Sequence, residues 1–255
     1  FSKIQSDWVA KLTQFVQAYP KAEDTPDALL QLGMVSEFLG KEVEAKNWYN
    51  QIVKNFAGKP QTAKAAGSIR RLESEGQPLS LVGTQLGNTS QTFDLTSIRD
   101  KMVIVYYWAS WNGQTVGDFA KLKLIQDTYA AKGLELVCVN LDNTQEEATT
   151  FLKRSPITAQ HLYQSGGLEG KLATDYGIQV LPHVFLIGKD GKVLLSERGF
   201  PDVESVLNLL GQAEGKEVPP PPAATTTAHT ESAENLRSPG KKSADVQDID
   251  SKQAI

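Results

Sequence analysis

Residues 103–115 have the sequence VIVYYWASWNGQT. The first part, residues 103–107, is an uninterrupted run of β-branched and aromatic side chains, which is typical of a strand buried on both faces. Residues 134–140 form a second run of this kind. Residues 115–129 lie between the two runs, and their apolar side chains share one helical stripe: Phe119, Leu122, Ile125 and Tyr129. The pattern predicts a buried strand, a helix and a second buried strand.

The alternation continues on both sides of this unit. Two short apolar runs, 184–187 and 193–195, flank Asp190-Gly191, a dipeptide that favours a tight hairpin turn. Residues 202–210 have the pattern of a closing helix. We therefore predict that residues 78–212 form an α/β domain, with a central mixed sheet flanked by helices.

Helical periodicity dominates residues 1–75, which we predict to be a small all-α domain. Residues 26–56 pair two helices, and small and apolar side chains have the spacing of a tetratricopeptide repeat: Leu29, Leu32, Gly33, Ala45, Tyr49 and Ile52. This segment resembles the tetratricopeptide family over about one repeat, with one helix before it and another at 62–73. One repeat buries little core by itself, so either the hairpin docks on the next domain or further repeats precede Phe1.

The last segment, residues 213–255, has a different composition. It contains four consecutive prolines, three consecutive threonines, twelve charged residues and no aromatic residue. Such a segment cannot bury enough apolar surface to offset the entropy lost on ordering. We predict a disordered tail or linker.

Composition excludes several classes of function. The 255 residues carry a formal charge of -4 with a pI near 5.5, which provides no broad positive field for nucleic acid or an anionic membrane surface. The longest apolar run, residues 102–109, is far shorter than the roughly 20 residues of a membrane-spanning helix. The chain begins at Phe1, so it could be a processed form or part of a longer protein with a targeting segment upstream.

Cys138 is the only cysteine of the sequence. It excludes an intramolecular disulfide and a multi-cysteine metal site. Valines flank it in a predicted buried strand, where a thiol behaves as a small hydrophobe, so we expect a structural role for it.

Several motifs together identify a family. The run 103–111, the segment Tyr176-Gly177-Ile178 followed by Leu181-Pro182, and residues 185–187 with Asp190-Gly191 resemble the thioredoxin superfamily. The resemblance is closest to the TlpA and ResA branch of envelope thiol-disulfide oxidoreductases, whose additional N-terminal hairpin matches the segment around Phe93. It implies a thioredoxin-like fold and a location in the bacterial periplasm or cell envelope.

In that family the tryptophan is followed by Cys-x-x-Cys at the start of a helix, where the helix dipole promotes thiolate formation. The matching positions in this chain are Asn112, Gly113, Gln114 and Thr115. An amide and a hydroxyl form no mixed disulfide, so we predict no catalytic residue here. We expect Asn112 to be the helix N-cap, with ligand contact as the alternative.

The resemblance also provides candidates for peptide or ligand binding: Trp111, Asn112, Leu181, Pro182 and His183. Pro182 matches the cis-proline of the family, which either leaves the backbone of Leu181 free to pair with an extended peptide or only shapes the entrance to a strand. Trp111 is either an exposed anchor or a packing residue. His183 could contact a ligand, but we expect it at the surface or at a strand edge.

No metal or cofactor site is predicted. His183, His161 and His229 lack neighbouring ligands. The glycine-rich run 165–171 departs from a phosphate-binding loop at both its first glycine and its hydroxyl position. Asp142, Glu146 and Glu147 resemble a carboxylate cluster, but Thr144 and Glu147 have capping-box spacing, so we expect a solvated helix entrance.

The sequence therefore predicts a thioredoxin-fold protein without the dithiol, acting as a non-catalytic binding or scaffolding module for protein or peptide partners. The alternative is a member of the thiol-disulfide oxidoreductase family whose redox activity resides in, or depends on, another domain or partner. A purely structural part of a larger envelope assembly is a third interpretation.

Overall fold

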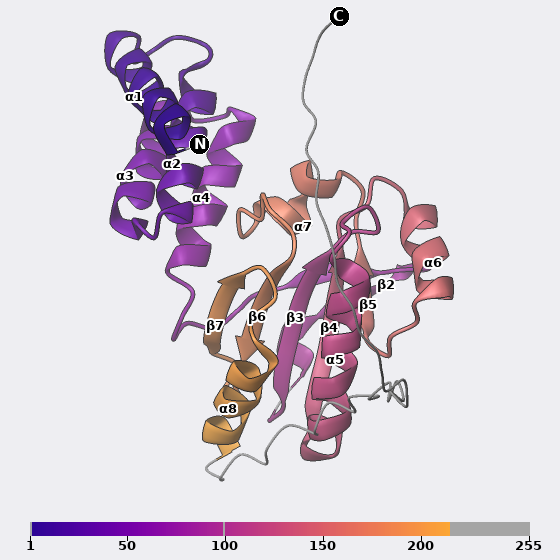
Figure 1. Ribbon diagram of the computed structural model, residues 1–255. Coiled ribbons are helices and arrows are strands. Elements are labelled where there is room, and N and C mark those ends of the chain that lie inside the picture. Colours follow the sequence, from indigo (N-terminus) through magenta and orange to yellow (C-terminus); the bar gives the residue numbers. More distant parts are fainter. Residues whose placement is uncertain (1, 99, 215–255) are drawn as a thin grey trace, which may run out of the picture. The chain divides into compact units, whose positions relative to one another are not determined.

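The computed structural model describes residues 2–98 and 100–214, which belong to one compact unit (Figure 1). Four helices come first: α1 (Ser2–Ala18), α2 (Thr25–Phe38), α3 (Glu42–Asn55) and α4 (Pro60–Leu72). The predicted tail lies outside the described residues from position 215 onward, while Ala213 and Glu214 still belong to the last helix. Among residues 2–98 and 100–214, no helix combines the length and the hydropathy that a membrane span requires.

An α/β part follows the helices. Its strands are β1 (Val82–Gln85), β2 (Asn88–Asp94), β3 (Met102–Trp108), β4 (Leu134–Asn140), β5 (Gln160–Tyr163), β6 (His183–Ile187) and β7 (Val193–Arg198). Its helices are α5 (Thr115–Tyr129), α6 (Gln145–Arg154), α7 (Lys171–Thr174) and α8 (Val203–Glu214), and three short 3-10 turns lie at Leu95–Ser97, Ala130–Lys132 and Gly167–Glu169.

The seven strands form one mixed sheet in the order β2-β1-β5-β4-β3-β6-β7. Strands β3, β4 and β5 run parallel, whereas β6 and β7 are antiparallel additions on the other side of β3. Every residue of β3 is buried, as its apolar sequence predicts. The predicted mixed sheet flanked by helices is therefore confirmed.

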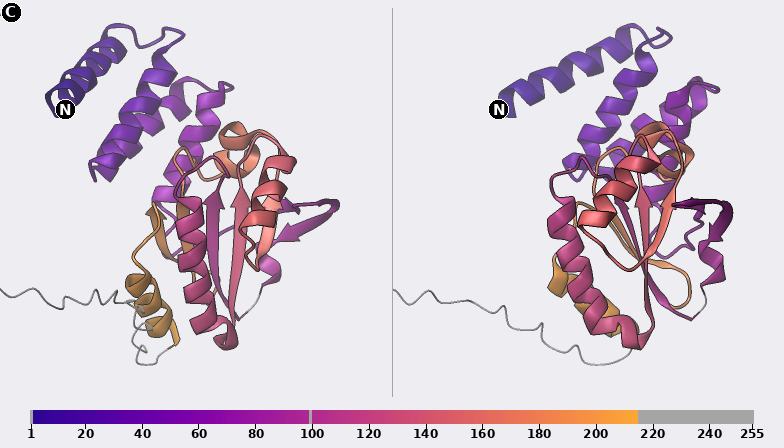
Figure 2. Two further views of the ribbon diagram at one scale, coloured as in Figure 1. Left: turned by 45° about the vertical axis from the view of Figure 1, so that its right-hand side comes forward. Right: turned by 90° about the vertical axis from the view of Figure 1, so that its right-hand side faces the viewer.

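Side chains of β3 alternate between the two faces of the sheet. Tyr106 and Trp108 point into a core shared with α5, α6 and α8, which lie together on one face (Figure 2). Tyr107 points into the opposite core, which is closed by α7 and by the segment that leads into β1. This second face is the one that the N-terminal helices reach.

Close packing fixes the hairpin of α2 and α3. A Cβ atom built on Gly33 would overlap the ring of Tyr49, so the glycine is what lets the two helices approach. Tyr49 belongs to a separate helical core, in which Leu29, Leu32 and Ile52 are also buried. The small residues of the predicted repeat therefore lie where two helices meet.

Helix α4 docks directly on the α/β part. A Cβ atom built on Gly67 would overlap the backbone of Thr174 and Gly177, so α4 and the end of α7 touch through their main chains. Arg70 strengthens this contact with a 2.7 Å hydrogen bond to the carbonyl oxygen of Asp175. The helical segment therefore contacts the α/β part through α4, the helix that follows the predicted hairpin.

The connection between α4 and β1 covers part of the outer edge of β7. Gly76 N donates to the carbonyl of Val193 at 2.8 Å, and Val193 N donates to the carbonyl of Gln77 at 2.9 Å. Further along the same edge, the N–H of Ser196 donates to the carboxylate of Glu75 at 3.3 Å. A linking segment therefore satisfies backbone groups that an edge strand would otherwise expose.

Candidate functional site

The positions that match the family's dithiol lie between the end of β3 and the start of α5. Thr115 is buried, and its hydroxyl donates to the carbonyl of Ala109 at 2.9 Å. Asn112 is half-buried, and its side-chain oxygen accepts a 3.0 Å hydrogen bond from Gln114 N. Both side chains therefore bind the main chain of this turn.

The prediction that Asn112 caps α5 is wrong in position. The helix begins at Thr115, and its N-cap is Gln114, which makes no side-chain capping bond. Asn112 instead closes the preceding turn, as asparagine does when its side chain bonds to an amide two residues ahead. The hydroxyl of Thr115, the first residue of the helix, bonds to Ala109 at the start of the same turn.

A buried carboxylate holds the loop that leads to this turn. Asp142 follows β4 and accepts hydrogen bonds from Ser110 N at 2.8 Å and Ser110 Oγ at 2.9 Å. Its second oxygen accepts from the amide of Asn140 at 2.7 Å. The solvated environment expected for Asp142 is therefore wrong, because three donors satisfy the carboxylate inside the protein. The capping box of Thr144 and Glu147 is confirmed.

A second buried carboxylate lies one turn into α5. Asp118 is 3% exposed and accepts a 3.1 Å hydrogen bond from the hydroxyl of Tyr106, while Lys121 approaches its other oxygen at 3.1 Å. Burial raises the pKa of Tyr106, followed by the charge of Asp118, so the phenol stays a neutral donor. Sequence reasoning did not identify this pair, because an aspartate in a first helical turn is usually a solvated partner of the helix dipole.

The Leu181-Pro182 peptide bond is cis, and Pro182 is buried at the entrance to β6. The carbonyl of Pro182 accepts a 2.9 Å hydrogen bond from Gly199 N. By contrast, within residues 2–98 and 100–214 the backbone N–H and carbonyl of Leu181 form no hydrogen bond.

Exposed apolar side chains lie in the turn before α5, in the first turn of α5 and immediately before Leu181. Trp111 is 57% exposed, so of the two interpretations of this residue the structure favours the exposed one. Val116, in the first turn of α5, and Val180, immediately before Leu181, are also exposed. Large exposed aromatic residues are common anchors in protein interfaces.

His183 is not at the surface or at a strand edge, as expected, but buried at 3% exposure on β6 between β3 and β7. Its Nε2 lies 3.2 Å from the hydroxyl of Ser196, and its ring packs against Phe185 with 4.7 Å between ring centroids. Burial lowers the pKa of His183 well below its ordinary value, and the charges of Arg71 and Arg198 lower it further. The expectation was wrong because Arg71 of α4 and Arg198 of β7 lie beside His183, and neither is close to it in the sequence.

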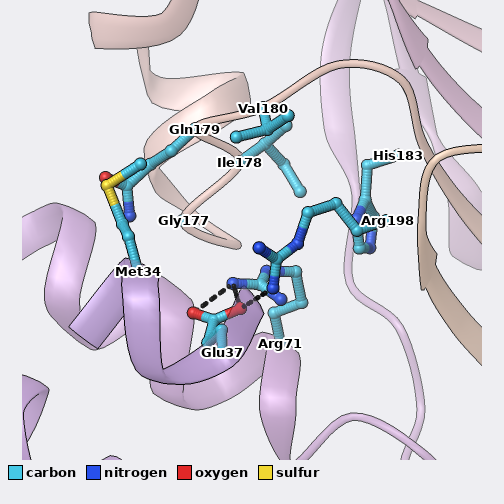
Figure 3. Close-up of a pocket in the computed structure, with 9 residues that line it drawn as sticks. All are labelled: Met34, Glu37, Arg71, Gly177, Ile178, Gln179, Val180, His183 and Arg198. Atoms are coloured by element: carbon cyan, nitrogen blue, oxygen red, sulfur yellow. Dashed lines mark hydrogen bonds and ion pairs between the residues drawn. The ribbon is translucent and has the colours of Figure 1, made fainter. Parts of the chain in front are cut away.

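A polar cluster joins the helices to the sheet close to His183 (Figure 3). Glu37 on α2 accepts hydrogen bonds from Arg71 on α4 at 2.9 Å, from Arg198 on β7 at 2.8 Å and from the hydroxyl of Tyr49 at 2.6 Å. Arg71 also donates through Nε to the carbonyl of Tyr176 at 3.1 Å. Sequence reasoning missed this cluster, because its members lie far apart in the chain.

The single thiol does not contribute to the site. Cys138 is fully buried in β4, as predicted, and burial raises its pKa. In the part of the chain that the structure describes, no three His, Cys, Asp or Glu side chains gather in a way that could hold a metal ion. The site therefore presents amide, hydroxyl, apolar and backbone groups.

Comparisons with known proteins agree with this architecture. A family model described as Thioredoxin-like matches residues 100–193. Thiol-disulfide oxidoreductase ResA from Bacillus thuringiensis subsp. konkukian is 26% identical over 106 residues, which are 42% of this chain and 60% of that protein. Sporulation thiol-disulfide oxidoreductase A from Bacillus subtilis is 24% identical over 98 residues, 37% of this chain and 58% of that protein.

A solved structure of a thiol:disulfide interchange protein from Bacteroides sp. covers 54% of this chain and 91% of its own, with 20% identity and a TM-score of 0.46. This chain spans about 60% of the length of the ResA relative. The family match and the mixed sheet confirm the predicted thioredoxin-like fold. The ResA relative confirms the predicted resemblance, and helices α1 to α4 confirm the predicted N-terminal helices.

Proposed function

We propose that this chain, whose α/β part is a thioredoxin-like domain related to thiol-disulfide oxidoreductases, binds protein or extended peptide partners without exchanging disulfides itself. One observation carries the proposal: Asn112 and Thr115 occupy the positions of the family's two cysteines, and both side chains are hydrogen-bonded to backbone. The same proposal divides the chain into a helical domain, residues 1–75, and a thioredoxin-like domain, residues 78–212.

The chemistry of exchange supports this proposal. Disulfide exchange begins with attack by an accessible thiolate. Cys138 has 0% exposure, and burial raises its pKa, so both access and ionisation oppose attack. This sequence therefore has no accessible thiol that could carry out disulfide exchange.

Backbone and apolar groups support peptide binding. Within the described residues Leu181 has a free N–H and carbonyl, which suit the main-chain pairing by which an added strand binds. Exposed Trp111 and Val180 would provide apolar contact for side chains of that strand. The partner we infer is an unfolded or extended polypeptide.

Two measurements on the purified chain test the loss of exchange. Insulin reduction should proceed at the rate of the buffer control. Cys138 should react with a thiol reagent only after denaturation. Insulin reduction above the buffer rate that disappears in Cys138→Ser would contradict the proposal.

Peptide binding is tested with reduced, carboxymethylated lactalbumin as the extended polypeptide. We expect Trp111→Ala to weaken binding, whereas Trp8→Ala should not, since Trp8 is an exposed tryptophan of α1. Equal binding by wild type and Trp111→Ala would exclude Trp111 as the anchor.

The alternative, redox activity that depends on another domain or partner, is favoured by the similarity to ResA and by the Thioredoxin-like family match over residues 100–193, which include the site segment. It predicts that this chain accelerates disulfide reduction by a separate dithiol protein. The first proposal predicts that adding this chain leaves the rate of disulfide reduction by the dithiol protein unchanged.

A further inference from the structure

The turn between β3 and α5 contains an asparagine followed by a glycine, Asn112-Gly113 (Figure 1). None of the other asparagines of the sequence precedes a glycine. In such a pair the main-chain nitrogen of the glycine can attack the side-chain carbonyl carbon of the asparagine and close a five-membered ring. Whether this happens depends on access to the nitrogen and on activation of the carbonyl.

The nitrogen of Gly113 is accessible. The residue is exposed, and within residues 2–98 and 100–214 its main-chain N–H donates no hydrogen bond. A Cβ atom built on Gly113 would meet nothing within 4 Å, so no neighbouring group crowds this peptide. Glycine itself has no side chain to hinder the approach of its nitrogen.

The side chain of Asn112 is folded over the same peptide. Its Oδ1 accepts a 3.0 Å hydrogen bond from Gln114 N, and the ring that this bond closes contains both Cγ of Asn112 and the nitrogen of Gly113. A main-chain donor at this oxygen stabilises the negative charge that develops on it during attack. Nδ2 of Asn112, the leaving group, makes no hydrogen bond to any residue that the structure describes.

We propose that Asn112 is a site of spontaneous deamidation, with the main-chain nitrogen of Gly113 as the nucleophile and water as the second reactant. The nitrogen bonds to Cγ, the bond from Cγ to Nδ2 breaks, and Nδ2 leaves as ammonia with the proton of the Gly113 N–H. Water then opens the five-membered imide at either carbonyl, which yields aspartate or isoaspartate. No electrons are transferred, and the reaction depends neither on peptide binding nor on the loss of exchange.

Deamidation changes the charge of the candidate binding site. Both products carry a carboxylate, which is ionised at neutral pH, at the position that matches the first cysteine of the family. In isoaspartate the main chain also runs through Cβ, so the turn before α5 is one atom longer. The chain therefore exists in an amide form and in a carboxylate form, and the carboxylate form favours partners with basic side chains.

The test incubates the purified chain at neutral pH and follows deamidation by mass spectrometry of tryptic peptides. An isoaspartate-specific methyltransferase identifies the isoaspartate product. Asn88 is the internal control, because it is exposed and its Oδ1 accepts a bond from Ser90 N at 3.3 Å, but it precedes Thr89 instead of a glycine. A β-branched residue hinders attack by its own nitrogen. We expect Asn112 to react about tenfold faster than Asn88, which corresponds to a barrier lower by about 1.4 kcal/mol.

Gly113→Ala provides a matched variant. The backbone of Gly113 does not have a positive φ, and the new methyl group would meet nothing within 4 Å, so the turn should be kept. We expect deamidation of Asn112 to slow about tenfold in this variant, because a side chain now hinders the attacking nitrogen. Equal rates at Asn112 and Asn88 in the wild type would overturn the proposal without any variant, as would an unchanged rate in Gly113→Ala.

Discussion

The guanidinium of Arg198, on the last strand of the sheet, donates a 2.8 Å hydrogen bond to the carboxylate of Glu37, on the second helix, across 161 residues of sequence. Arg71 meets the same carboxylate from α4. One buried charge thus connects three elements. Removing such a carboxylate is strongly destabilising, because its charged partners then stay buried without a counter-charge.

We therefore expect Glu37→Gln to lower the free energy of unfolding by about 3 kcal/mol, because two arginines then face each other without a carboxylate. Urea titration measures this change. Glu44→Gln is the control: its pair with Lys41 has side chains that are 57% and 45% exposed, and such pairs contribute less than about 1 kcal/mol. Equal losses for the two variants would show that Glu37 carries no special role.

Gly67→Ala should separate α4 from α7. The new methyl group would overlap backbone atoms of Thr174 and Gly177, which cannot rotate away, so we expect a loss of about 1 to 3 kcal/mol. Gly117→Ala is a matched control within α5, where a Cβ atom meets nothing within 4 Å. That substitution should leave stability unchanged or raise it by up to about 0.5 kcal/mol, because alanine has a higher helix propensity than glycine and Gly117 lies in the first turn of α5. Chemical denaturation of both variants tests the difference.

Asn112→Cys combined with Thr115→Cys should introduce disulfide exchange. The two positions bracket the start of α5, where the helix N-terminus favours a thiolate. We expect insulin reduction above buffer for the double variant and none for either single variant, since exchange needs a resolving thiol. A silent double variant that forms its disulfide normally would show that this turn no longer has the geometry of the family's active site.

Stability should fall as the pH drops below about 6.5. Burial, and then Arg71 and Arg198, lower the pKa of His183 in the folded protein, whereas the unfolded chain accepts a proton near 6.5. The unfolded state then binds more protons, so the contribution of this histidine is complete above pH 6.5 and decreases below it, by at most about 1.4 kcal/mol per pH unit. His161 shifts in the same direction.

Urea titrations at pH 7.5, 6.5 and 5.5 measure that dependence. His183→Asn should flatten it, while His161→Asn should leave the part due to His183 in place. An unchanged slope in His183→Asn would contradict a buried neutral histidine at this position.

Local pattern was sufficient to predict the centre of the sheet. The runs at 103–107 and 134–140 correspond to β3 and β4, because strands buried on both faces need continuous apolar sequence. The helix between them has the predicted bounds, 115–129. Strand β5, by contrast, is only four residues long with mixed polarity, and its sequence has no pattern that indicates a strand.

Predictions of burial and of polar partners were wrong at positions whose neighbours in space are distant in the sequence. His183 follows a proline in a short run, and nothing within ten residues indicates the arginines of α4 and β7 that cover it. Asp142 seemed to belong to a helix entrance because its partner, Ser110, lies 32 residues away. Glu37 occupies a helix position that sequence alone assigns to solvent. Sequence reasoning recovers periodic structure, but not the partners of a buried charge.

The segment between α4 and β1 has a practical consequence for anyone who wishes to study the α/β part by itself. Truncation immediately before β1 would remove Glu75, Gly76 and Gln77, and with them the partners of Val193 and Ser196 on β7. In the resulting fragment the backbone groups of β7 would be unpaired at the edge of the sheet. Such an exposed edge strand favours pairing between molecules and aggregation. A cut ahead of Glu75 keeps this cover in place.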